Sequence, residues 1–170
     1  MTPRDETEFC AALAASPQPD RAHEALCAMA QRLVGVKLFT TMTFDADTGM
    51  ARRAWSNMPD AYPVSGTKPA NETDWARQVL HRHQVFVAND LAGIRAVFFD
   101  HELIARLGCA SVLNVPVVIG GRVIGTLNLL HEAGHFTPDR VAAAQALRLP
   151  GALCLMLAHR HALTSDEELT

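Results

Sequence analysis

The sequence lacks the features that mark several classes of protein. It has no CxxC pair, and its cysteines are few and widely spaced: Cys10, Cys27, Cys109 and Cys154. This pattern excludes a zinc knuckle and predicts reduced, buried thiols. Basic residues are neither clustered nor in excess, with 15 Lys and Arg against 18 Asp and Glu, so we expect no nucleic-acid partner.

Membrane and export signals are also missing. The first residues, MTPRDETEF, are polar and acidic where a signal peptide would be basic and then apolar. We see no apolar run that approaches the roughly 20 residues needed to cross a bilayer. We therefore expect a cytoplasmic protein that does not interact with a membrane.

What is present is an ordinary globular composition. Hydrophobic residues make up 49% and charged residues 19% of 170 residues, enough to bury a core without disulfides or metal. We expect one domain over residues 1–170, in which residues 1–19 form an N-terminal helical extension and residues 164–170 a frayed tail.

Hydrophobic periodicity predicts a mixture of helices and antiparallel strands. In chain order we expect a broken helix over residues 5–34, strands at 36–44 and 50–55, an irregular segment over 56–72, a short helix at 75–80, a strand at 85–87, a helix ending at Gly108, a hairpin over 111–131 and a terminal helix from Thr137 to about Leu163. The fold class is therefore α+β.

Local signals place the helix ends. Asp20 is the expected N-cap of the second part of the first helix, and Asn71 or Thr73 that of the short helix. Thr137, followed by proline, is the expected N-cap of the terminal helix. We expect Pro150-Gly151 to kink or briefly break that helix.

The clearest stretch is the hairpin SVLNVPVVIGGRVIGTLNLLH. If Gly120-Gly121 is a two-residue turn, Leu113 lies opposite Asn128. One face then carries Val112, Asn114, Val118, Val123, Gly125, Leu127 and Leu129. The other carries Leu113, Val115, Val117, Ile124, Thr126 and Asn128, and its mixed character makes it the candidate pocket wall. Gly125 would let a helix approach the first face closely.

Directly after this hairpin the chain reads HEAGH, which matches a zinc-protease pattern. That chemistry needs both histidines on one helical turn. Here the motif follows a strand, Gly134 disfavours a helix, and the helix begins only at Thr137. A third ligand of the extended motif is also missing, because a proline stands at position 138. We expect His131 to end the strand and His135 to lie in an exposed turn.

The hairpin and the residues between it and the terminal helix resemble the GAF domain family. The residues that carry the resemblance are Val115-Pro116-Val117, Gly121, Val123 to Leu127, and Phe136-Thr137-Pro138-Asp139. The resemblance is closest over residues 109–160. It implies an antiparallel sheet of about five or six strands, with terminal helices on one face and short helices and loops enclosing a pocket on the other.

The same resemblance implies a small-molecule-binding regulatory module that forms a homodimer through its terminal helices. The ligand is unidentified, because members of the family bind cyclic nucleotides, tetrapyrroles, haem and small metabolites. The candidate pocket residues are Trp55, Tyr62, Trp75, Asn89, Phe98, Phe99, Leu113 and Asn128.

Two alternatives remain open from the sequence. One is a thiol enzyme of the free methionine sulfoxide reductase type built on Cys109, although no second cysteine lies near it in the sequence. It would require a low thiol pKa and a resolving cysteine within reach. The other is a structural dimerisation module whose aromatic residues only fill its core.

Overall fold

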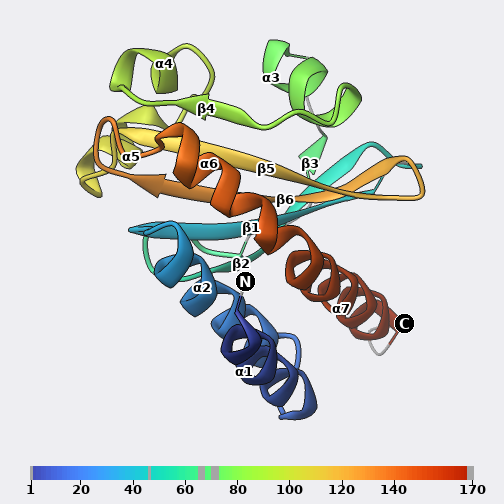
Figure 1. Cartoon of the computed structure of the whole chain (residues 1–170). Helices are drawn as coiled ribbons and strands as arrows, with labels where there is room; N and C mark the ends of the chain where they lie inside the picture. The colour runs from blue at the N-terminus through green and yellow to red at the C-terminus, as the bar shows by residue number, and fades with distance from the viewer. Residues whose placement is uncertain (1, 46, 65–67, 70–72, 168–170) are drawn as a thin grey trace.

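The computed structural model of the chain describes residues 2–45, 47–64, 68–69 and 73–167 (Figure 1). Its strands are β1 (Leu38–Asp45), β2 (Met50–Ser56), β3 (Lys68–Pro69), β4 (Phe86–Ala88), β5 (Ser111–Ile119) and β6 (Arg122–His131). Its helices are α1 (Pro3–Ala14), α2 (Asp20–Leu33), α3 (Asp74–Ala76), α4 (Leu91–Arg95), α5 (His101–Arg106), α6 (Pro138–Ala144) and α7 (Arg148–Glu167). A π-helical turn (Arg77–His81) follows α3, and a 3₁₀ turn (Gln145–Leu147) joins α6 to α7.

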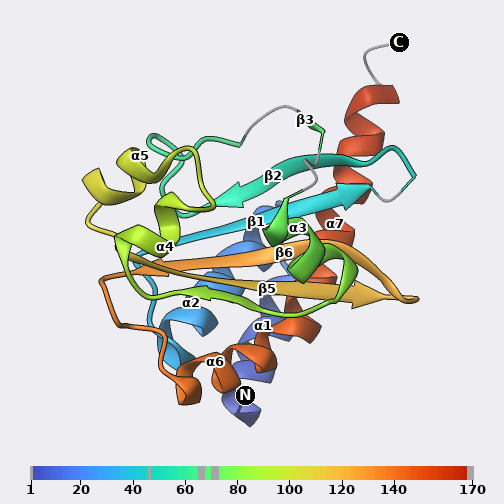
Figure 2. The same ribbon diagram turned by 90° about the horizontal axis from the view of Figure 1, so that it is seen from above.

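The six strands form one antiparallel sheet in the order β3-β2-β1-β6-β5-β4. The two hairpins β1–β2 and β5–β6 pair through β1 and β6, which are the two central strands. Figures 1 and 2 show α1, α2 and α7 on one face and α3, α4 and α5 on the other. The predicted α+β architecture, with helices covering both faces, is therefore confirmed.

A β-bulge between Val117 and Val118 decides which way the side chains of the central hairpin point. The register follows the predicted two-residue turn only at the tip, and beyond the bulge it shifts by one residue, so that Asn114 lies opposite Asn128. The predicted pairing of Leu113 with Asn128 is therefore wrong. Leu113 instead faces Leu129 on the helix side, where both are fully buried. A one-residue shift exchanges the two faces of a strand.

The main core lies between the sheet and the N- and C-terminal helices. Its buried members come from both helical ends of the chain and from the central strands: Phe9, Leu26, Met29, Phe39, Leu113, Val115, Leu127, Leu129, Phe136, Leu147 and Leu155. Gly125 is part of the reason that α7 packs so closely on β6. A Cβ atom added there would lie 2.8 Å from the Leu155 methyl groups, as the predicted close helix approach requires.

The terminal helix is interrupted before the predicted point. The break is the 3₁₀ turn at Gln145–Leu147, and α7 runs through Pro150 and Gly151 without stopping. Pro150 has no N–H to bond the carbonyl one turn earlier, so the irregular geometry falls on that preceding turn. Thr137 caps α6 as predicted, with Pro138 at its first position.

The helical tract from Pro138 to Ala162 has a mean hydropathy of 1.6 over its most apolar window, so length and composition alone would let it span a membrane. The expectation that no such run exists is therefore wrong. Core helices of globular proteins share this composition, and Ala144, Cys154 and Leu155 are buried against the rest of the domain.

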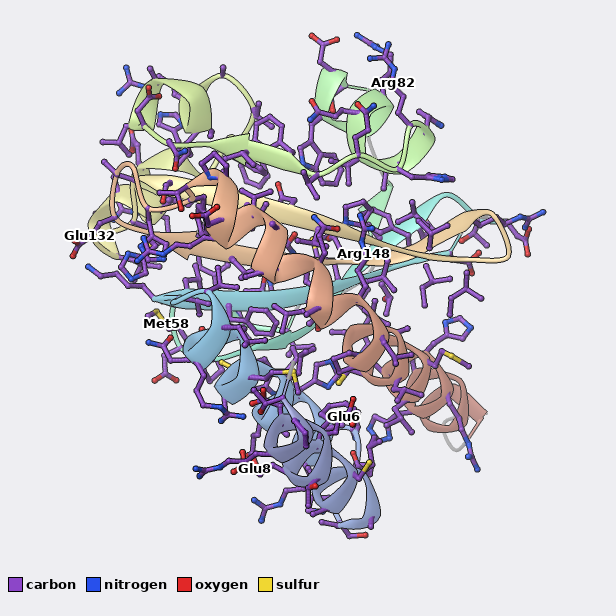
Figure 3. The ribbon with its side chains drawn as sticks, viewed as in Figure 1. Glu6, Glu8, Met58, Arg82, Glu132 and Arg148 are labelled. Carbon is purple, nitrogen blue, oxygen red and sulfur yellow. The ribbon has the colours of Figure 1, made fainter. Side chains whose placement is uncertain are left out.

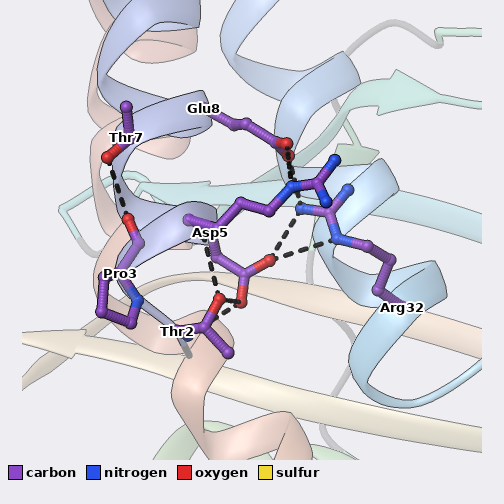
Figure 4. A network of polar contacts seen from close by, with 7 residues as sticks. Thr2, Pro3, Asp5, Thr7, Glu8 and Arg32 are labelled. Carbon is purple, nitrogen blue, oxygen red and sulfur yellow. Dashed lines mark hydrogen bonds and ion pairs between the residues drawn. The ribbon is translucent and has the colours of Figure 1, made fainter.

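Helix α1 is fastened to α2 by a polar network (Figure 4). Thr2 and Asp5 form a capping box, and Arg32 of α2 donates two hydrogen bonds to Asp5 Oδ1 at 3.2 and 2.8 Å. The Thr2 backbone N–H, Arg32 and the Thr2 hydroxyl hold the pKa of Asp5 below its ordinary value. The predicted N-terminal extension is thus a helix held to α2. At α2 itself the N-cap is Pro19, one residue before the predicted Asp20.

Candidate functional site

A cavity of about 210 Å³ lies on the sheet face that α3, α4 and α5 cover. The lining side chains come from the floor of the sheet, from the segment after β2 and from the covering helices: Thr40, Met42, Phe44, Ala51, Arg53, Tyr62, Thr73, Trp75, Val97, Phe98, Phe99, Asp100, Ile104, Val112, Asn114, Asn128 and Leu130. Apolar walls with a few polar groups are typical of small-molecule sites.

The polar part of the floor is a chain of hydrogen bonds across three strands. Trp75 Nε1 donates to Asn114 Oδ1 at 2.9 Å, Asn114 Nδ2 donates to Asn128 Oδ1 at 2.7 Å, and Asn128 Nδ2 donates to Thr40 Oγ1 at 3.2 Å. Both asparagines are nearly inaccessible to solvent, at 2% and 7% exposure. The chain holds the Trp75 ring over the sheet, with Thr73 capping α3 beside it.

A second polar group lies on the side of the cavity formed by β2. The Arg53 guanidinium carbon lies 4.6 Å from the centre of the Tyr62 ring, and its Nη1 donates to the Pro63 carbonyl at 3.0 Å. The Tyr62 hydroxyl donates to Asp100 Oδ2. Burial raises the pKa of Tyr62, and the hydrogen bond to Asp100 raises it further, so the phenol stays protonated.

The structure brings five of the eight predicted site residues to this cavity: Tyr62, Trp75, Phe98, Phe99 and Asn128. Tyr62 is nearly fully buried, whereas Phe99 is 85% exposed and stands at the rim. Their placement agrees with the expected pocket, while ligand binding by them stays a prediction.

The other three predicted residues lie elsewhere. Trp55 is on the helix side of the sheet, stacked on His23 with ring centres 5.8 Å apart. Asn89 binds the Phe136 backbone N–H and carbonyl, both at 3.0 Å, and so positions the segment before α6. Leu113 belongs to the main core because the bulge turns it to the helix side.

Sequence reasoning missed five polar residues of the site: Thr40, Arg53, Thr73, Asp100 and Asn114. The alternation of β1 and β2 contained a signal for two of them, because Thr40, Met42 and Phe44 share a face and Arg53 lies opposite Met42. Asn114 was assigned to the wrong face because the bulge was not foreseen. Asp100 had no signal, since it lies in a loop between two short helices.

Cys109 does not have the environment of a catalytic thiol. It is 1% exposed, it does not line the cavity, and burial raises the pKa of its thiol. A reactive cysteine needs an accessible sulfur and a lowered pKa. The geometry therefore gives no support to the reductase alternative.

The HEAGH segment is a structural joint between β6 and α6. The rings of His131 and His135 stack with centres 3.6 Å apart, so the expectation of an exposed turn at His135 is wrong. His135 Nε2 lies 2.9 Å from the Val34 carbonyl and 3.1 Å from that of Gly35, while Nδ1 faces Arg140 Nη1 at 3.2 Å. Nε2 must therefore donate and Nδ1 accept, which leaves no ring nitrogen for a metal.

The glutamate of the HEAGH segment is paired with a lysine and not with a metal ligand set. Glu132, at one end of the sheet in Figure 3, forms an ion pair with Lys37 at 2.7 Å. No cluster of three or more His, Cys, Asp or Glu with metal-binding geometry occurs among the described residues.

An antiparallel sheet with terminal helices on one face and a covered cavity on the other defines an α+β domain of the kind found in sensors. The chain belongs to the GAF domain family, whose sequence profile matches residues 18–168. No curated protein sequence matches it significantly.

Solved structures with the same fold include the GAF domain of a two-component sensor histidine kinase from Bacillus halodurans. That structure has a TM-score of 0.64 and 14% identity, and the match covers 86% of this chain and 99% of that one. A GAF domain/HD domain protein from Geobacter sulfurreducens has a TM-score of 0.62 and 16% identity, with 85% and 94% covered. At these identities the likeness establishes the fold, which is typical of sensory and regulatory domains.

The stacked histidines predict a stability that depends on pH. Burial lowers the pKa of His131, and the neighbouring His135 lowers it further, as do Lys37 and Arg140, while Glu132 acts in the opposite sense. The folded state therefore binds a proton less readily than the unfolded chain, whose histidine pKa is about 6.5. Stability is then complete above that pH and is lost as the pH falls through and below it.

We expect the Tm to fall between about pH 7 and pH 5, and to fall less steeply in His131→Asn, whose amide oxygen can replace Nδ1 as acceptor for the Glu132 N–H. His83→Asn is the matched control, because His83 has a positive φ that asparagine tolerates. Calorimetry at several pH values measures the slopes. If Tm depended on pH equally steeply in wild type and in His131→Asn, His131 would not be the cause of the pH dependence.

Proposed function

We propose that this protein is a non-enzymatic sensory or regulatory domain that binds a small molecule in the cavity beneath α3, α4 and α5 and acts as a homodimer. The single observation that carries the proposal is the cavity itself. It combines aromatic and aliphatic walls with an ordered row of polar groups on a rigid sheet. Sheets position polar groups more accurately than loops do, which favours specific binding over a merely filled core.

The related folds support a sensory role. The Bacillus halodurans and Geobacter sulfurreducens structures are parts of a sensor histidine kinase and of a GAF domain/HD domain protein. A cyanobacteriochrome GAF domain also shares the fold, with a TM-score of 0.57, 19% identity and coverage of 85% of this chain and 97% of that one. A cavity closed by short helices and a loop suits a ligand-dependent ordering of that cover.

Filling the cavity should abolish the thermal response to small molecules. We expect Ala51→Leu, which places a larger side chain at the cavity wall, to remove any stabilisation that a metabolite library gives the wild type. A ligand at 100 times its Kd stabilises by about 2.7 kcal/mol, which corresponds to several degrees in Tm. Differential scanning fluorimetry measures the shift.

The control is Ala54→Leu, the same substitution three positions along β2, which lines a separate hollow beside α7. Val112→Phe provides a second way to fill the cavity if Ala51→Leu lowers the Tm by itself. A ligand that still stabilises both filled variants as well as wild type binds elsewhere. In that case the cavity is not the site.

The dimer part of the proposal rests on α7. Three of its large apolar side chains, Leu149, Leu153 and Met156, are 67%, 38% and 55% exposed, and their spacing places them along one side of the helix. Exposed apolar stripes of this kind mark association surfaces. A second copy is the occupant we propose, because the stripe lies on the terminal helix that GAF domains characteristically pair.

We expect the wild type to sediment as a dimer and the double variant Leu149→Glu/Leu153→Glu as a monomer, because two buried charges without partners would oppose association. Analytical ultracentrifugation over a range of concentrations measures this. Ile119→Glu, at the tip of the β5–β6 hairpin, is the control, since Ile119 is 44% exposed and is not part of the α7 stripe. A monomeric wild type, or a variant that still dimerises, would refute the interface.

A further inference from the structure

We propose that the ligand is an aromatic carboxylic acid of one or two rings, whose carboxylate binds Arg53 and the Thr40 hydroxyl. The inference rests on the proposed function, since it names the ligand class of the same cavity. It follows from the direction of the hydrogen bonds on the cavity floor, from the unused capacity of one arginine, and from the shape of the apolar walls.

The floor of the cavity presents hydrogen-bond donors. An indole N–H can only donate, so Asn114 must turn its amide oxygen to Trp75 and its NH₂ group to Asn128. Asn128 must in turn point its NH₂ group to Thr40, which accepts. The hydroxyl hydrogen of Thr40 is then left to donate onward, and each asparagine keeps a second N–H. A ligand that meets this floor must supply acceptors.

Arg53 has unused capacity to donate hydrogen bonds. Among the described residues it forms no ion pair, and Nη1 is its only nitrogen in a hydrogen bond, made to the Pro63 carbonyl. Its Nε is buried without a partner among these residues. Guanidinium groups match carboxylates in geometry, so the nitrogens of Arg53 that make no hydrogen bond can bind a ligand carboxylate.

Arg53 and Thr40 are placed to share one carboxylate. Arg53 lies opposite Met42 in the β1–β2 pairing, and Met42 is two residues from Thr40 on the same face of β1. Two residues of strand span about 7 Å, which an arginine side chain reaches across. Both residues line the cavity. The acid end of the ligand therefore belongs at the β1–β2 side of the floor.

Asp100 lies on the same side of the cavity as Arg53, because both contact Tyr62. Its carboxylate accepts the Tyr62 hydroxyl and also lines the cavity, so it repels an anion and favours an acid group that binds Arg53 on the side of Thr40, away from Tyr62. Its remaining lone pairs can accept a hydrogen bond from a ring hydroxyl or amino group. A hydroxy- or amino-substituted aromatic acid should therefore bind more tightly than the unsubstituted acid.

The walls and the volume favour an aromatic body. Phe44, Trp75 and Phe98 also line the cavity, and flat rings pack well against aromatic faces. A dry cavity of about 150 Å³ holds benzene. The 210 Å³ here therefore suits one ring, or a small fused pair, with its substituents.

The test is calorimetric titration with benzoate, 4-hydroxybenzoate, phenylacetate and indole-3-carboxylate, each paired with its neutral primary amide. We expect the acids to bind at least tenfold more tightly than the amides, and Arg53→Gln to remove that preference by weakening acid binding about 10- to 100-fold. Thr40→Val should weaken acids by a smaller factor. Arg52→Gln is the control, because Arg52 lines the hollow on the other face of β2.

The outcomes separate the two proposals. Amides that bind as tightly as acids, or an Arg53→Gln variant that binds acids like wild type, would overturn the acid assignment and leave the cavity as a binding site. If no acid in the panel binds while unrelated compounds give a thermal shift that Ala51→Leu abolishes, the ligand class is wrong and the proposed function holds. If nothing binds in either assay, both are wrong. Circular dichroism of each variant verifies that it is folded.

Discussion

The indole N–H of Trp75 is the group on which the order of the cavity depends. Because it can only donate, it fixes the orientation of Asn114, and through it that of Asn128 and Thr40. Helix α3 is thereby linked to β5, β6 and β1 by hydrogen bonds that all donate in the same direction, from Trp75 toward Thr40. Buried polar chains of this kind are costly when incomplete and specific when satisfied. Here each asparagine both donates and accepts within it.

This chain of hydrogen bonds forms only because the central hairpin contains a single-residue bulge. Without the bulge at Val117/Val118, Asn114 and Asn128 would lie on opposite faces, and the apolar residues Leu113 and Val115 would cover the cavity floor. With the bulge, apolar side chains of β5 and β6 face the terminal helices, and the amides of Asn114 and Asn128 face the cavity. The same strand β6 thus presents Gly125 to Leu155 of α7 and Asn128 to the cavity.

Much of the architecture was predictable because it depends on local chemistry. The glycine pair at the hairpin tip, the Thr137-Pro138 helix start and the GAF-like motif around them each act over a few residues, and each was confirmed. The bulge was not predictable from alternation, because both faces of this hairpin are apolar and a shift of one residue leaves the pattern plausible. That one error misplaced Leu113 and hid Asn114. The rest of the site depends on contacts between distant segments: Tyr62 comes from the long irregular segment and Asp100 from a loop 38 residues later. No pattern in the sequence predicts the contact between Tyr62 and Asp100.

The central claim is that a small molecule binds beside Trp75 and not on the helix side of the sheet. The chain contains two tryptophans, Trp75 in the cavity and Trp55 against His23 on the opposite face. Proton–nitrogen NMR of the two indole N–H groups during titration with a bound aromatic acid tests the claim directly. We predict that the Trp75 signal moves and the Trp55 signal stays. A shift confined to Trp55, or binding that moves neither, would contradict the account.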